Sequence, residues 1–208
     1  MNVPAAIEHI AVGISALTGV LAARGKGLDL FGVLVLAVVT AFGGGTVRDL
    51  LVGDTPVAWL KNPSFLYTAL GVGVSSFFVV RIWRRRAGLL NIADAFALAL
   101  FNVVGARKGL AMGFDGSVAV MLGVVTGVAG GIVRDALIGR VPVVFRRDTY
   151  FYATAAAAGG LVYAVLLRGA GWNANAAEFC GIVTCLLLRL AALRWRLALP
   201  AMDSPDEK

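Results

Sequence analysis

The sequence predicts an all-α polytopic membrane protein with seven transmembrane helices, arranged as an inverted three-plus-three repeat followed by a seventh helix. Three observations predict this fold. The 208-residue chain is 59% hydrophobic and only 15% charged, with a mean hydropathy of +0.84, which is too apolar for a soluble domain of this size. Its apolar runs have the length of about 20 residues that a bilayer-spanning helix needs. A Gly-Gly-x-x-Arg-Asp motif also occurs twice, in the second and fifth of these runs.

The apolar runs are separated by short connections rich in Gly, Pro, Asn, Asp and Arg, as loops are. Seven crossings put Lys61, Arg107, Lys108 and Arg168 on one side of the membrane and most other Lys and Arg on the opposite side. Because basic loops stay in the cytoplasm, we expect an external N-terminus and a cytoplasmic C-terminus in a prokaryotic inner membrane. The net charge of +7 is spread over loops, so we expect no nucleic-acid partner. The runs lie at residues 5–23, 28–52, 64–83, 90–107, 115–139, 149–168 and 175–197.

The two motifs belong to a longer internal repeat. "GGGTVRDLLVGDTPV" (43–57) matches "AGGIVRDALIGRVPV" (129–143) at a shift of 86 residues. One repeat unit holds three spans, and three is odd, so the second copy must enter the membrane from the opposite side. We therefore expect a first repeat over 1–86, an inverted second repeat over 87–168, and a seventh helix with a polar tail over 169–208, all in one integral membrane domain.

The glycine runs predict where a polar path crosses the bilayer. Glycine weakens a helix locally, and carbonyls freed by a break are tolerated only against protein or a watery cavity. We expect the second and fifth spans to be kinked and broken there, with a monovalent cation at the carbonyls near Gly44 and Gly130. The alternative is that small residues let two helices pack closely. The expected lining residues are Gly43, Gly44, Gly45, Thr46, Gly130 and Gly131, with Ser15, Thr18, Thr40, Asn102 and Thr126 as polar neighbours.

Charges inside the spans need partners, because an unpaired ion in hydrocarbon is costly. Adjacent residues on a helix point about 100° apart, so Arg48 and Asp49 are expected to pair poorly with each other. The repeat indicates other partners, which act either in gating or as purely structural locks. The hypothesised pairs are Glu8–Arg48, Asp94–Arg134, Asp49 with Arg107 or Lys108, and Asp135 with Arg24.

Two stretches carry a resemblance to a known family. "GLDLFGVLVLAVVTAFGGGTVRDLLVGDTPVAWLKNPSF" and "NIADAFALALFNVVGARKGL" resemble prokaryotic members of the trimeric intracellular cation channel family, also described as glycine-transporter-like membrane proteins. The resemblance implies a homotrimer with one pore in each subunit, kinked second and fifth helices, and conduction of monovalent cations, chiefly potassium. It also implies a gating role for Lys108, beside Arg107. From the residues alone, a lysine at a helix end equally well extends to the interface. The second motif reads Ala129-Gly130-Gly131, a shorter glycine run that predicts a weaker kink.

These observations favour a passive cation channel, in which carbonyls and hydroxyls replace part of an ion's water shell. The alternative is a secondary transporter of glycine or another small amino acid, which would use the same helix breaks. An enzyme is not expected, because the sequence has no histidine cluster, nucleophile motif or metal-ligand spacing. We expect no cofactor. K⁺ or Na⁺ would be the permeating ion, and the partners would be membrane lipids, which can bind, and further copies of the chain.

Overall fold

A computed structural model describes residues 3–82, 88–146 and 151–196, and these residues form helices joined by short connections. The predicted all-α fold is confirmed. Two short helices, α3 and η1, follow α2 and α6, and the last turns of the α7 segment form a π-helix, η2. The elements are α1 (Val3–Ala23), α2 (Leu30–Leu51), α3 (Ala58–Lys61), α4 (Ser64–Ile82), α5 (Leu89–Ala111), α6 (Gly116–Leu137), η1 (Val143–Phe145), α7 (Tyr152–Ala164), η2 (Val165–Gly169) and α8 (Ala174–Trp195).

Six helical segments are long and apolar enough to cross a membrane, namely α1, α2, α5, α6, α7 with η2, and α8. The apolar part of α4, Ser64–Val80, is shorter by the same measure, so the seventh crossing stays a prediction. The largest difference from the expected spans is in α5, which continues to Ala111 instead of ending at residue 107. Arg107 and Lys108 therefore lie inside the helix, where carboxylates from other helices neutralise them.

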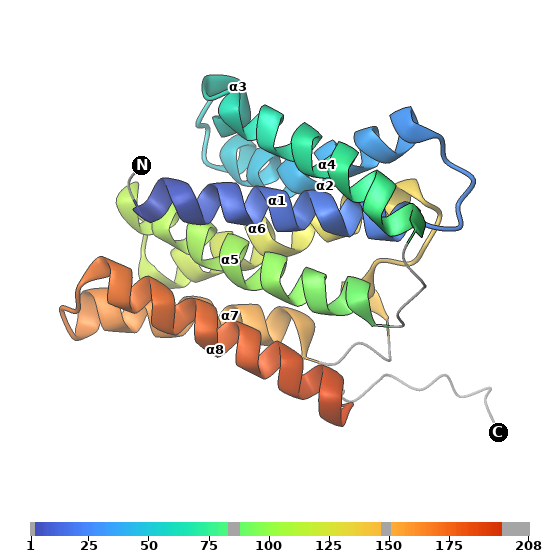
Figure 1. The fold of residues 1–208 in the computed structure, drawn as a ribbon. Coiled ribbons are helices and arrows are strands. Elements are labelled where there is room, and N and C mark those ends of the chain that lie inside the picture. Colours follow the sequence, from blue (N-terminus) through green and yellow to red (C-terminus); the bar gives the residue numbers. More distant parts are fainter. Residues whose placement is uncertain (1–2, 83–87, 147–150, 197–208) are drawn as a thin grey trace, which may run out of the picture.

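The helices α1, α2 and α4 pack against one another. In Figure 1, α1, α2 and α4 lie together in the upper part of the bundle, and α8 runs along the opposite edge beside α7. In addition, α1 packs against α5 and α2 packs against α6. These two helices of the first repeat therefore contact their own counterparts in the second repeat. The expected boundary at residues 86–87 and the polar tail over 200–208 lie outside the described residues.

The ends of α2 and α6 repeat the same local structure. Gly53 and Gly139 follow these helices with φ angles of +69° and +66°, a left-handed conformation that glycine adopts without steric cost. At each end, an amide donates to the carbonyl of the motif aspartate, Asp49 or Asp135, at 2.9 and 2.8 Å. The 86-residue repeat in sequence is therefore a repeat in backbone geometry as well.

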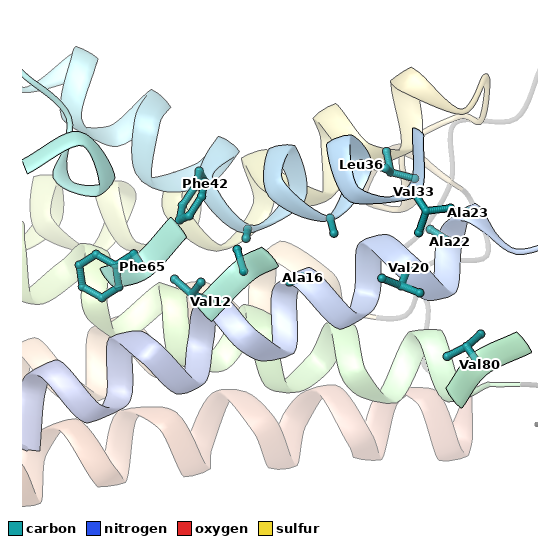
Figure 2. Packing of buried hydrophobic residues seen from close by; sticks show 13 residues of the cluster. Val12, Ala16, Val20, Ala22, Ala23, Val33, Leu36, Phe42, Phe65 and Val80 are labelled. Carbon is teal, nitrogen blue, oxygen red and sulfur yellow. The ribbon is translucent and has the colours of Figure 1, made fainter. Parts of the chain in front are cut away.

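Small and branched apolar residues bring the helices of the first repeat close together. Figure 2 shows Val12, Ala16 and Val20 of α1 facing Leu36 and Phe42 of α2, within a buried cluster that α4 completes. Large apolar side chains also cover the outside of the bundle. Both features are typical of a membrane protein, in which lipid surrounds an apolar surface and small residues allow close helix contact.

Candidate functional site

The two glycine runs meet where α2 crosses α6. A methyl group at Gly44 would lie 2.0 Å from the carbonyl oxygen of Thr126, and one at Gly130 would lie 2.5 Å from that of Thr40. Thr40 and Thr126 occupy the same position in the two repeats, so the crossing is nearly symmetric. Only glycine permits the backbones to approach this closely.

The expected breaks in these helices are not present. Both α2 and α6 continue as α-helices through their glycines, so the carbonyls there keep their helical hydrogen bonds. The close packing of small residues, the alternative reading, accounts for Gly43, Gly44 and Gly130. A smooth kink without a break stays a prediction. The cost of freeing carbonyls in hydrocarbon explains why the helices stay intact and the glycines act at the contact instead.

Two cavities lie along α2, and the residues of the α2–α6 crossing line the second of them. We name the first, of about 40 Å³, the Glu8 cavity; aromatic rings, Gly45, Glu8 and Arg48 line it. We name the second, of about 10 Å³, the Asp94 cavity; it has room for roughly one water molecule. Hydroxyl residues and glycines line the Asp94 cavity, namely Ser15, Thr18, Thr40, Thr126, Gly44, Gly130 and Gly131, together with Arg134.

Two of the expected polar lining residues lie elsewhere. Thr46 accepts a hydrogen bond from the indole N–H of Trp59 at 3.2 Å and lines neither cavity. Asn102 is fully buried on α5, where its amide lies against Gly123 of α6 and Gly159 of α7. The hydroxyls of Thr40 and Thr126 donate to carbonyls one turn earlier in their own helices, at 2.5 Å.

At the Asp94 end of the bundle, Arg134 joins two carboxylates. Its Nη1 lies 2.9 Å from Oδ1 of Asp94 on α5, which confirms the hypothesised pair. Its Nε lies 2.9 Å from Oδ1 of the neighbouring Asp135. All three side chains are buried, so this cluster places its one positive and two negative charges out of water. Asp135 also accepts from the amide of Val143, and its expected pair with Arg24 stays a prediction.

At the Glu8 end, the charges pair differently from the hypothesis. Arg48 binds its own neighbour Asp49 at 2.8 Å, so the expectation that these two pair poorly is wrong. The expected Glu8–Arg48 pair is also wrong, because Glu8 binds Arg107 of α5. The pair of Asp49 with Lys108 is confirmed at 2.6 Å. The long arginine side chain reaches the carboxylate of the next residue, which the directions of the two Cα–Cβ bonds alone do not predict.

The comparisons with known proteins place this repeat in a family. A family model described as glycine transporter matches residues 5–81 and again 91–168, in agreement with two copies of one unit. The UPF0126 inner membrane protein YadS of Escherichia coli is 40% identical over 195 residues, which cover 93% of this chain and 93% of that protein. The chain belongs to the UPF0126 family. It is a multi-pass membrane protein.

Solved structures of related proteins share the fold of this UPF0126 member. The TRIC trimeric intracellular cation channel orthologue from Rhodobacter sphaeroides is 38% identical, with a TM-score of 0.88 over 95% of this chain and 100% of that chain. A structure that describes conductance through TRIC cation channels is 33% identical, with a TM-score of 0.84 and 98% coverage of both chains. These matches confirm the resemblance to trimeric intracellular cation channels.

Sequence reasoning missed three charged residues of this family member. Glu178 of α8 is buried and lies 3.2 Å from Arg107, so one guanidinium holds α1, α5 and α8 together. Arg189 of α8 is also buried, with its guanidinium carbon 4.7 Å from the centre of the Tyr152 ring. Both lie in α8, which has no repeat counterpart, so the repeat could not assign their partners. Their charge within an apolar run was the available signal.

The third missed residue, Asp54, lies in the loop after α2. Lys108 and Lys61 both bind its carboxylate, and their hydrogen bonds lower its pKa from the usual 3.8 to about 2. Lys108 therefore bridges Asp49, which is fully buried, and Asp54, which solvent reaches. The repeat hides this role, because the counterpart of Asp54 is Arg140.

Proposed function

We propose that this chain forms a passive channel for monovalent cations, chiefly potassium, with one path in each subunit of a homotrimer. The observation that carries the proposal is the fold-wide match to solved TRIC cation channels, at 38% identity and a TM-score of 0.88. The two cavities, which share Phe101 as a lining residue, support a path inside the subunit. The proposed path runs from the Glu8 cavity past the glycines to the Asp94 cavity.

Ion passage requires that α2 and α6 separate, because both cavities are too narrow for a hydrated ion. Separation would expose the carbonyl oxygens of Thr40 and Thr126, which now lie against the glycines of the opposite helix. These oxygens supply the cation site expected near Gly44 and Gly130. Arg48 and Arg134 are neutralised by neighbouring aspartates, so they present no net positive barrier to a cation.

We propose that Lys108 contributes to voltage dependence. It is held by Asp49 and Asp54 at one end of the path, and moving one charge through 100 mV changes the free energy by about 2.3 kcal/mol. Lys108→Gln is therefore expected to flatten the voltage dependence of opening. We also propose the external N-terminus that the basic loops predict, which one-sided labelling of terminal tags would test.

Single-channel recording of the purified protein in a planar bilayer tests the main proposal. Discrete current steps with a reversal potential that follows the potassium gradient are expected. Gly44→Leu is expected to abolish the steps. Gly71→Leu is the control for the loss of a glycine outside the path, because Gly71 lies in α4 and an added carbon there meets no atom within 4 Å. A silent bilayer with correctly folded protein would contradict the channel.

A second candidate function is a carrier for glycine or a similarly small amino acid. It is favoured by the description of the matching family model and by the Glu8 cavity, where a carboxylate and a guanidinium line one space beside stacked Phe42 and Trp59 rings. That pairing of charges suits a zwitterion. Saturable glycine uptake into proteoliposomes, lost in Arg48→Gln, would support the carrier, and its absence alongside current steps would exclude it.

A further inference from the structure

One aromatic residue touches both cavities. Phe101 of α5 lines the Glu8 cavity and the Asp94 cavity, and no other described residue lines both. Its ring is partly buried and packs against the apolar cluster of α1, α2 and α4. Phe101 therefore lies between the two hollow parts of the proposed path, on a helix that contains neither glycine run.

The repeat shows that this aromatic is a departure from symmetry. The counterpart of Phe101 in the first repeat is Ser15, and that of Val104 is Thr18. Ser15 and Thr18 line the Asp94 cavity, whereas Phe101 and Val104 line the Glu8 cavity. The same two positions are thus polar in the first repeat and apolar in the second.

We propose that Phe101 sets the barrier between the two cavities and so limits cation passage through the resting path. The proposal rests on the proposed function, because it concerns the path through the α2–α6 crossing. A cation that reaches the ring must shed water, and a phenylalanine side chain offers no oxygen to replace it. Apolar constrictions hold ions back in this way, by losing water. Ser15 supplies such an oxygen in the Asp94 cavity, where its hydroxyl donates to the carbonyl of Thr40 at 3.1 Å.

The barrier can be tested by measuring how fast a cation reaches a thiol in the Asp94 cavity, without recording current. In a background with Cys180→Ala and Cys185→Ala, the variant Ala97→Cys puts a thiol in the Asp94 cavity. Ag⁺, a thiol-reactive cation of a size similar to K⁺, is applied only from the side of Glu8. We expect slow reaction with Phe101 present, a rate at least about tenfold higher with Phe101→Ser, and an intermediate rate with Phe101→Leu.

A matched control separates a lowered barrier from a loosened bundle. Val103→Cys places the thiol two residues away from Phe101, in a buried cluster of α5, α6, α7 and α8 whose buried members line neither cavity. This thiol is expected to stay unreactive in every variant. If Phe101→Ser makes the Val103→Cys thiol reactive, the bundle has loosened, and the Ag⁺ rate in Phe101→Leu then tests the barrier. Phe101→Leu is the smaller change, because it keeps an apolar side chain against the cluster of α1, α2 and α4.

Unchanged Ag⁺ rates at Ala97→Cys in both Phe101 variants would overturn the proposal. Potassium flux into proteoliposomes is measured on the same variants. Faster Ag⁺ access together with at least about tenfold faster potassium flux supports both the barrier and the channel. Faster Ag⁺ access without potassium flux in any variant supports the barrier at Phe101 and contradicts cation conduction, so the two failures are distinguishable.

Discussion

Adding one methyl group at Gly44 should destabilise the bundle, whereas the same change at Gly45 should not. The added carbon at Gly44 would lie 2.0 Å from the carbonyl oxygen of Thr126, so α2 and α6 would have to move apart by more than about 1 Å. Overpacking of this kind costs about 1–3 kcal/mol. At Gly45 the nearest atom is Nη2 of Arg48 at 3.8 Å, which is an ordinary contact.

The difference in stability between Gly44→Ala and Gly45→Ala therefore measures the effect of the close approach of α2 to α6. Alanine forms helix better than glycine by about 1 kcal/mol, so Gly45→Ala should be neutral or slightly stabilising. A cost of about 1–3 kcal/mol corresponds to a fall in Tm of about 2–12 °C for a chain of this size. Thermal unfolding in detergent, followed by tryptophan fluorescence, is the assay. If Gly44→Ala unfolds within a degree or two of Gly45→Ala, the crossing is not as tight as described.

The remaining predictions concern charges. Arg134→Gln should destabilise the fold by about 3–5 kcal/mol, because it leaves two buried carboxylates without their cation; denaturant unfolding of the variant measures this, and a loss below about 1 kcal/mol would contradict it. The lowered pKa of Asp54 means that its stabilisation is present above about pH 4 and is lost as the pH falls towards 2, so the difference in Tm between wild type and Asp54→Asn should shrink over that interval. A difference that stays constant would refute the assignment. The side chain of Asp115 accepts from the amide of Ser117 at the start of α6, and Asp115→Ala should lower stability by about 0.5–2 kcal/mol in the same unfolding assay.

The sequence was sufficient for the features that follow from composition and repetition. Hydropathy predicts the long helices to within a few residues, and the 86-residue shift predicts the Asp94–Arg134 pair. The shift succeeds there because both partners lie in the repeated core of three helices. It fails for Glu178 and Arg189, because α8 is present once and its neighbours depend on packing that no internal copy records.

The glycine runs show a second limit of sequence reasoning. A run of glycines lowers the cost of breaking a helix and also lowers the cost of approaching another backbone, so the residues alone favour neither outcome. Whether a glycine run breaks the helix or packs closely depends on what the neighbouring helix places against it. Here each glycine run faces the other, and the carbonyls of Thr40 and Thr126 occupy the space that side chains would have filled.

The failed Glu8–Arg48 pair follows from a difference between the two repeats. Arg107, which takes Glu8, corresponds to Leu21 in the first repeat, so the Asp94 end has no matching competitor for its carboxylate. Asp94 therefore keeps Arg134, while Glu8 pairs with Arg107 of α5, which also binds Glu178 of α8. Substitutions at a few non-matching positions, Arg107 against Leu21 and Phe101 against Ser15, thus give the two ends different chemistry on a common backbone. We propose that the repeated helices supply the path and that these unmatched residues decide how each half is held and where the barrier lies.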